Sequence, residues 1–218
     1  MLEYTVGRTS DARENLIESA IELIGNRSYN AVGVQELCEH AGVKKGSFYH
    51  FFPSKRHLTL EAMDTIWQNY KGEMLEPICC AKVPALKKLE SMLRKSYELQ
   101  TKSKECGGCV TGCGFGNLAL ELSTQDEVIR QKIADIFEDW AGSLERVIAQ
   151  AVNEGDLPAD TDTRATSQAI ISYIEGIYVL AKAFNDPGMI PRLGEGVFSI
   201  CIRRVDDAAA AVESGVKG

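Results

Sequence analysis

The chain has 218 residues, of which 44% are hydrophobic and 25% charged, and its net charge is −7, as for an ordinary globular protein that buries a core. No apolar run approaches the length of a membrane span, and the first residues lack the apolar stretch of a secretory signal. The cysteines number seven, which argues against a simple disulfide framework, so we expect a cytoplasmic protein with reduced thiols.

The charge is distributed unevenly along the chain. Residues 1–57 hold seven basic and seven acidic side chains, whereas the remainder carries the whole net charge of −7. Between His40 and His57 there is no Asp or Glu. Because exposed charges farther apart than roughly 8 Å are largely screened, a local basic patch can bind a polyanion although the chain as a whole is acidic.

The pattern of apolar residues predicts helices almost throughout, so the fold class is all-α. The first helix is expected to be capped by Thr9 or Ser10 and to end at residues 26–28. Two short helices follow, at about 34–41 and 44–51, on either side of Gly42.

The next helix is expected to begin at Pro53–Ser54 and to run to about Lys71. Two short helices joined by a turn that contains glycine are typical of a helix-turn-helix. Further along, longer helices are predicted at about 83–102, 116–122, 126–153, 163–184 and 189–206.

The third helix divides into two faces. Phe48 and Phe52 are four residues apart, so they can face the core together. The other faces then carry Lys45, Ser47, Tyr49 and His50, a mixture suited to an anionic partner.

The stretch VGVQELCEHAGVKKGSFYHFFPSKRHL, residues 32–58, resembles the DNA-binding domain of TetR-family transcriptional regulators. The positions that follow the family pattern in register are Ala41, Gly42, Val43, Lys45, Gly46, Ser47, Phe48, Tyr49, Phe52, Ser54 and Lys55. Two positions depart from it. Gly33 stands where a Ser or Thr usually caps the second helix and bonds a phosphate. His57 stands where a Glu often completes a capping box with Ser54, so we expect that box to be incomplete.

The resemblance implies a homodimer in which each recognition helix enters the major groove of a pseudo-palindromic operator in double-stranded DNA. Lys44 and Lys45 lie at a helix N-terminus, which favours phosphate, and Gly46 allows a close approach of the backbone. With Ser47, the two lysines are our candidates for base readout. The remaining candidate DNA-binding residues are Tyr49, His50 and Lys55 as phosphate contacts, Arg8 in the N-terminal arm, and Gly33.

The same resemblance implies two domains. Residues 1–57 are expected to form the helix-turn-helix DNA-binding domain and residues 58–218 a helical domain that binds a small effector and dimerises. Dimerisation is expected through the helices near 163–184 and 189–206, whose apolar surfaces could otherwise serve a monomer core. Candidate effector-binding residues are Trp67, Tyr70, Cys113, Asn117, Trp140, Tyr173 and Tyr178, although each could also be plain core.

The stretch KECGGCVTGCGFGNLALE contains a third feature. Its Gly112-Cys113, Gly116-Asn117-Leu118 and Glu121 resemble the Gly-Cys-x-x-Gly-Asn-Leu pattern of one branch of the family, and Cys106 and Cys109 depart from that pattern. Three interpretations remain open. The thiols can be fillers of a Gly-rich connector, Cys106 and Cys109 can be redox-sensing, or the cluster, perhaps with Cys79 or Cys80, can bind a metal.

The sequence therefore predicts a TetR-like repressor that a small molecule or a thiol-reactive compound releases from its operator. The alternative is a thiol/disulfide or metal-binding helical protein that uses Cys106, Cys109 and Cys113. We expect no enzymatic activity and no cofactor, assign no metal site, and expect no membrane association. No nucleophile–base pair, P-loop or dinucleotide fingerprint occurs, and all three histidines lie in the basic region.

Overall fold

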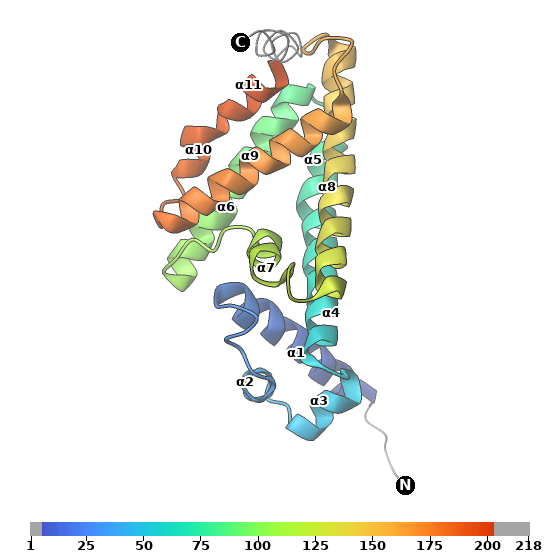
Figure 1. Cartoon of the computed structure of the whole chain (residues 1–218), viewed down its shortest axis with the longest axis vertical. Coiled ribbons are helices and arrows are strands. Elements are labelled where there is room, and N and C mark those ends of the chain that lie inside the picture. The colour runs from blue at the N-terminus through green and yellow to red at the C-terminus, as the bar shows by residue number, and fades with distance from the viewer. Residues whose placement is uncertain (1–5, 203–218) are drawn as a thin grey trace, which may run out of the picture. The chain divides into compact units, whose positions relative to one another are not determined.

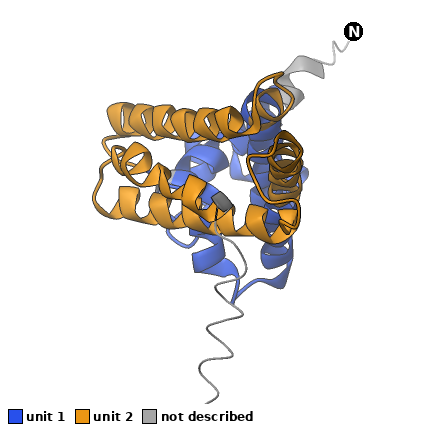
Figure 2. Ribbon diagram, turned by 90° about the horizontal axis from the view of Figure 1, so that it is seen from above, with its two compact units in different colours: residues 1–74, 111–138 blue, residues 75–110, 139–218 orange. Residues whose placement is uncertain are grey.

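The structure is a computed structural model that describes residues 6–202, with the side chains of residues 6–10, 26, 201 and 202 left undescribed. Every regular element in this range is a helix, as predicted (Figure 1). The chain forms two compact units (Figure 2). Unit 1 comprises the described residues up to Met74 together with Thr111–Glu138. Unit 2 comprises Leu75–Val110 and the described residues from Asp139 onward.

Unit 1 contains the helix-turn-helix. Helix α1 (Val6–Asn26) packs against α2 (Val34–His40), α3 (Lys45–Phe51) and α4 (Lys55–Tyr70). The same unit contains α7 (Gly114–Leu122) and the first part of α8 (Glu127–Glu154). The helix-turn-helix core consists of fully buried side chains from all four helices, among them Leu16, Leu37, Phe48, Phe52 and Leu58.

The turn between α2 and α3 depends on Gly42. Its φ of +66° lies in the left-handed region, which side chains disfavour and glycine adopts freely. Helix α2 ends at a C-cap, Ala41, and the amide of Val43 donates to the carbonyl of Cys38 at 2.8 Å. This hydrogen bond closes the turn and positions Lys44 as the N-cap of α3.

Two predictions about helix starts are wrong. Helix α1 begins at Val6, so Thr9 and Ser10 lie inside the helix rather than at its cap. At α4, the Oγ of Ser54 accepts from the amide of His57, and it also lies 2.9 Å from the Nδ1 of His57. The imidazole therefore bonds the cap residue in place of the usual Glu side chain.

Helix α4 does not stop near Lys71. The chain continues through a π-helical segment (Lys71–Leu75) into the short α5 (Glu76–Cys79), where unit 2 begins. Lys88 of α6 (Ala85–Gly107) is buried and holds the end of α5. Its Nζ donates to the carbonyl of Cys79 at 2.5 Å and to the Oε1 of Gln150 at 2.7 Å.

Unit 2 is built on α6, the second part of α8, and α9 (Thr163–Ala183). The predicted helix at 189–206 is interrupted. Residues 189–202 form two short helices, α10 (Met189–Gly194) and α11 (Gly196–Ile202), and both pack on α9. The Tyr173 hydroxyl donates to the Leu193 carbonyl at 2.9 Å and occupies the space that a Cβ at Gly196 would need. Residues 203–206 lie outside the described range.

Candidate functional site

The recognition helix α3 presents a polar surface. Phe48 has no exposed area, which fixes the inward face of the helix. Lys44, Lys45, Gly46, Ser47, Tyr49 and His50 are all exposed, and 54% of Tyr49 is accessible to solvent. The two aromatic rings meet edge to face at 5.1 Å, so Phe48 supports Tyr49 from the core. The structure thus brings six of the predicted DNA-binding residues onto one exposed helix.

An open groove runs beside α3. Its lining residues are Asp11, Ala12 and Asn15 of α1, the turn residues Ala41, Gly42, Val43 and Lys44, and Ser47, His50 and Phe51. The groove unites three predicted DNA-binding residues, Lys44, Ser47 and His50. Asp11 brings one acidic side chain to it, which the sequence pattern did not indicate.

Lys55 has a different role from the predicted one. Its Nζ donates to the carbonyls of Tyr29 and Val32 at 2.8 and 2.9 Å and lies 3.9 Å from the centre of the Tyr29 ring. Burial lowers the pKa of Lys55, and the Glu121 carboxylate opposes that shift. Because its ammonium is engaged inside unit 1, we do not include Lys55 among the phosphate contacts proposed below.

The loop between α1 and α2 is held from its other side by Glu121. The Oε2 of Glu121, on α7, accepts from the amide of Tyr29 at 3.0 Å, and its Oε1 accepts from the amide of Asn30 at 2.9 Å. Together with Lys55, the carboxylate therefore binds both the amides and the carbonyls of this loop. We call this arrangement the Glu121 clamp. The sequence contained Glu121 in the Gly-Asn-Leu pattern but gave no indication of its partners.

Two further positions complete the DNA-binding set. Gly33 is the N-cap of α2, with extended backbone and no side-chain cap, and open space surrounds the position where a Cβ would stand. Arg8 lies within α1, and its side chain lies outside the described structure.

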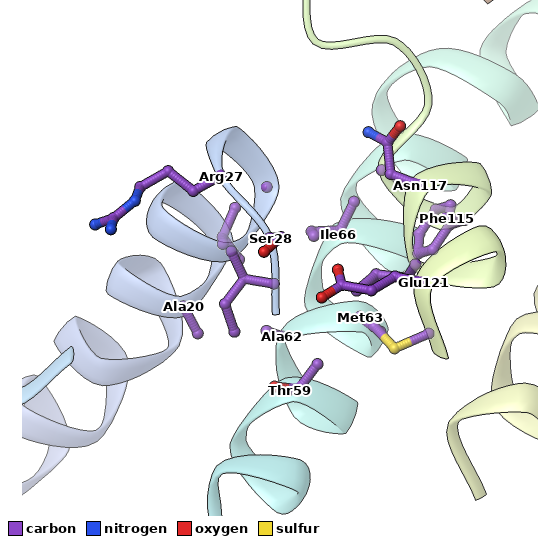
Figure 3. Close-up of a pocket in the computed structure, with 15 residues that line it drawn as sticks. Ala20, Arg27, Ser28, Thr59, Ala62, Met63, Ile66, Phe115, Asn117 and Glu121 are labelled. Carbon is purple, nitrogen blue, oxygen red and sulfur yellow. The ribbon is translucent and has the colours of Figure 1, made fainter. Parts of the chain in front are cut away.

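A second cavity in unit 1 lies between α1, α4 and α7 (Figure 3). Its volume is about 90 Å³ and its lining is mainly apolar. Figure 3 shows Glu121 extending from α7 toward α1 and α4, with Met63 and Phe115 beside it and the Arg27 side chain directed away. The lining residues are Ala20, Ile21, Ile24, Gly25, Arg27, Ser28, Thr59, Ala62, Met63, Ile66, Gly114, Phe115, Asn117, Leu118 and Glu121.

Four of the predicted effector-binding residues lie in unit 1. Trp67 is buried, stacks on Tyr70 and meets the edge of Phe115, a residue of the cavity wall. Asn117 lines the cavity, and its Nδ2 donates to the Thr111 carbonyl at 3.0 Å. Cys113 is the N-cap of α7, where its Sγ accepts from the Gly116 amide at 3.4 Å.

The other three lie in unit 2. Trp140 is buried, and Tyr178 is buried with its hydroxyl donating to the Ser96 Oγ at 2.8 Å. Tyr173 is half-buried and bonds the Leu193 carbonyl. Both tyrosine hydroxyls therefore have protein partners, which fits a structural role as well as an effector contact.

Cys106 and Cys109 are exposed on the connector that follows α6. Gly108 between them adopts a φ of +77°. Asn185, just past the end of α9, holds the connector. Its Oδ1 accepts from the Val110 amide at 2.9 Å and its Nδ2 donates to the Gly108 carbonyl at 3.2 Å. In the part of the chain that the structure describes, no group of three or more His, Cys, Asp or Glu side chains is arranged to hold a metal ion.

Family profiles match both parts of the chain. Residues 16–62 match the DNA-binding region described as bacterial regulatory proteins of the TetR family. Residues 85–195, half of the chain, match the tetracycline repressor-like C-terminal domain. The chain belongs to the TetR family.

Relatives in the TetR family are named regulators. The chain is 28% identical over 179 residues to the transcriptional regulator AcuR of Cereibacter sphaeroides, covering 78% of this chain and 76% of that one. It is 24% identical to the transcriptional repressor DhaR of a Mycobacterium species, covering 78% and 82% of the two chains. The protein is thus a DNA-binding transcriptional regulator of the TetR family.

Solved structures agree with the fold. The crystal structure of a TetR regulatory protein from Rhodobacter sphaeroides superposes with a TM-score of 0.77 at 25% identity, covering 88% of this chain and 99% of that one. A TetR-family regulator from Agrobacterium tumefaciens superposes with a TM-score of 0.79 at 16% identity, covering 89% and 100%. Within residues 6–202 no helix combines the length and the apolar character that a membrane crossing requires.

Proposed function

We propose that the protein is a homodimeric cytoplasmic repressor that places α3 of each subunit in the major groove of a pseudo-palindromic operator. It would act by binding, not by catalysis. The observation that carries this proposal is the exposed surface of α3, where Lys44, Lys45, Ser47, Tyr49 and His50 surround the buried Phe48.

The roles within this surface follow from chemistry. Lys44 and Lys45 stand at the N-terminus of α3, where free amides and the helix dipole attract phosphate, and either lysine can donate to the O6 and N7 of guanine. Ser47 is one turn further on and is short enough to reach a base edge. Tyr49 and His50 can donate to phosphate oxygens, which position the protein without reading sequence.

An apolar stripe on α9 supports the homodimer. Ile170, Ile174 and Ile177 are buried within unit 2. Residues on another side of the same helix stay exposed, although they are apolar: Val179 by 54%, Leu180 by 41% and, just past its end, Phe184 by 65%. An apolar surface of this kind is typical of a subunit interface. We propose that α9, with α10 and α11, packs against its counterpart in a second subunit.

The larger part of the chain would bind the effector. A ligand that prefers one spacing of the two recognition helices shifts the dimer toward that spacing. Half-sites one helical turn apart, about 34–36 Å, tolerate little change, so release follows.

A thiol-reactive compound is a second candidate effector, because Cys106 and Cys109 are both exposed and Asn185 ties their connector to the end of α9. Hydrogen peroxide would oxidise the two thiols to a disulfide, with the two electrons and two protons passing to the peroxide to give two water molecules. The Cys106→Ser/Cys109→Ser variant should then stay on DNA in the presence of peroxide. Undiminished release of that variant would eliminate the connector as the sensor.

Fluorescence anisotropy tests the DNA-binding proposal. A fragment selected from a random pool should bind more tightly than random duplex, and log Kd should depend linearly on log salt. Lys45→Ala should reduce the slope by about one, as expected for one lost phosphate contact. Lys82→Ala, a change at an exposed lysine of unit 2, is the matched control and should leave the slope unchanged. Equal slopes for both variants would contradict the placement of Lys45.

A further inference from the structure

Glu121 is a half-buried carboxylate that has no basic side chain in contact with it among the described residues. Two cations come near it. The ammonium of Lys55 is directed to the carbonyls of Tyr29 and Val32, and the guanidinium of Arg27 is paired with Glu36. A carboxylate removed from water in this way lacks its usual counter-charge, and supplying a cation would stabilise it.

The carboxylate also has unused acceptor capacity. Each of its oxygens accepts one backbone amide, from Asn30 at Oε1 and from Tyr29 at Oε2. An ionised carboxylate offers about four lone-pair sites, so about two remain for another donor. A new donor can therefore bind Glu121 without breaking the Glu121 clamp.

The space beside this carboxylate is hollow and apolar. The cavity of about 90 Å³ is walled by Ile24, Ala62, Met63, Ile66, Phe115 and Leu118, and Figure 3 shows Glu121 reaching into it. For comparison, an apolar cavity of about 150 Å³ admits benzene. A cavity of the present size, open at one side, suits a branched aliphatic group of a few carbon atoms.

We propose that this cavity binds a small aliphatic primary amine in its ammonium form. The ammonium donates to the free lone pairs of Glu121, and the hydrocarbon packs against Ile24, Met63 and Phe115. The charge on Glu121 selects the cation and the apolar walls select the hydrocarbon. The proposal rests on the proposed function only for its regulatory consequence, because binding itself requires no DNA.

That consequence follows from the Glu121 clamp. The bound ammonium fixes Glu121 between α7 and the loop at Tyr29 and Asn30, and this loop leads directly into α2 of the helix-turn-helix. A ligand that binds only the clamped arrangement shifts the protein toward it. The amine would therefore act on the position of α2 relative to α1, through contacts that all lie within unit 1.

The test uses three probes of one shape on the full chain: isobutylamine, isobutanol and isobutyrate. Calorimetry measures affinity, and the nuclear magnetic resonance signals of the Tyr29 and Asn30 amides report on the Glu121 carboxylate that accepts them. Isobutylamine should bind in the millimolar range, as expected for a ligand of five non-hydrogen atoms, and should shift both amide signals. Isobutanol should bind more weakly and isobutyrate not at all.

Three variants locate the effect. Glu121→Gln keeps the shape and removes the charge, and it should weaken isobutylamine binding about ten- to hundredfold, the range for a hydrogen bond to a charged group. Glu73→Gln, an exposed carboxylate of unit 1 outside the cavity, should bind normally. Ile66→Phe fills the cavity and leaves Glu121 in place, and it should exclude all three probes. Circular dichroism confirms that each variant is folded.

Two results would overturn the proposal. Equal affinity for isobutylamine and isobutanol would mean that Glu121 does not select a cation, and no binding by the folded protein would mean that the cavity is not a ligand site. Operator binding is measured on the same sample. Specific DNA binding without amine binding refutes the amine site alone, whereas amine binding without specific DNA binding refutes the proposed function alone.

Discussion

Lys55 illustrates how far a residue's role can be derived from its place in a motif. The family pattern places it at the start of α4, and the structure has it there. Its partners, however, are the carbonyls of Tyr29 and Val32, which belong to a loop more than twenty positions earlier in the chain. The direction of loop carbonyls depends on how α1, α2 and α4 pack, so the sequence motif alone could not predict this contact.

Glu121 gives the same lesson from the other side of the loop. The sequence pattern singled it out, but the two amides that it accepts lie about ninety residues away. By contrast, the division of α3 into a buried and an exposed face was predictable. It follows from helical periodicity, and the structure leaves Phe48 and Phe52 with no exposed area.

Cys79 provides a prediction about pH. Burial raises the pKa of its thiol from 9.0 to about 11, so the thiol stays protonated in the folded chain at a pH where the unfolded chain has lost the proton. The folded state then binds more protons between pH 9 and 11. Stability from this group is therefore complete below pH 9 and is lost as the pH rises toward 11, at no more than about 1.4 kcal/mol per pH unit.

Urea unfolding under reducing conditions measures this effect. Cys79→Ala should lower stability at pH 7, because it leaves a cavity, and should show a shallower fall than the wild type between pH 9 and 10.5. Cys80→Ala, which changes the exposed neighbour, should keep the wild-type pH dependence. Parallel curves for the wild type and Cys79→Ala would contradict the raised pKa.

At the scale of elements, the helices with clear periodicity were predicted within a few residues. The exceptions have local causes that the sequence pattern does not contain. The continuation of α4 through a π-helical segment into α5 depends on the buried Lys88 that holds the end of α5. The interruption at Glu195 depends on Tyr173, whose hydroxyl takes the space beside Gly196.

The turn between α2 and α3 makes a further prediction. Gly42 has a positive φ and open space at its Cβ position, so Gly42→Ala costs only backbone energy, about 1–2 kcal/mol. Gly42→Asn should cost less, because asparagine tolerates the left-handed region. Gly46, inside α3 and also with open space, is the matched control.

Gly46→Ala should raise stability by up to about 1 kcal/mol, because alanine is the better helix former. Chemical denaturation of the three variants gives the comparison. The opposite signs expected for Gly42→Ala and Gly46→Ala separate the turn from the helix, and a stabilised Gly42→Ala would refute the role of the turn.

At the scale of the whole molecule, the proposed homodimer gives the third prediction. Leu180→Glu with Phe184→Glu places two charges on the exposed apolar stripe of α9, and a charge in a subunit interface opposes association. The double variant should sediment as a folded monomer. Its operator affinity should fall steeply, because a monomer reads one half-site only.

The matched control is Leu120→Glu, at a leucine of α7 that is 81% exposed. It adds the same charge on a different helix and should leave the sedimentation coefficient unchanged. Dissociation by Leu120→Glu, or a dimeric double variant, would place the interface elsewhere.

Domain boundaries were the least predictable feature. The expected border after residue 57 falls inside α4, and the compact units divide at Met74 instead. Unit 1 also includes Thr111–Glu138, which are separated from its N-terminal part by a segment of unit 2. Periodicity describes each helix by itself, and it carries no information on which distant helices share a core.

This discontinuity affects how the protein is made. On the ribosome, α1 to α4 emerge first, but the loop amides of Tyr29 and Asn30 lack Glu121 until α7 has been synthesised. The stretch from Met74 to Glu138 then takes roughly three to thirteen seconds to translate, at about 5–20 residues per second. During that interval the nascent helix-turn-helix must persist without half of its clamp. A helix-turn-helix born early would thus complete its fold only when a later segment returns to it.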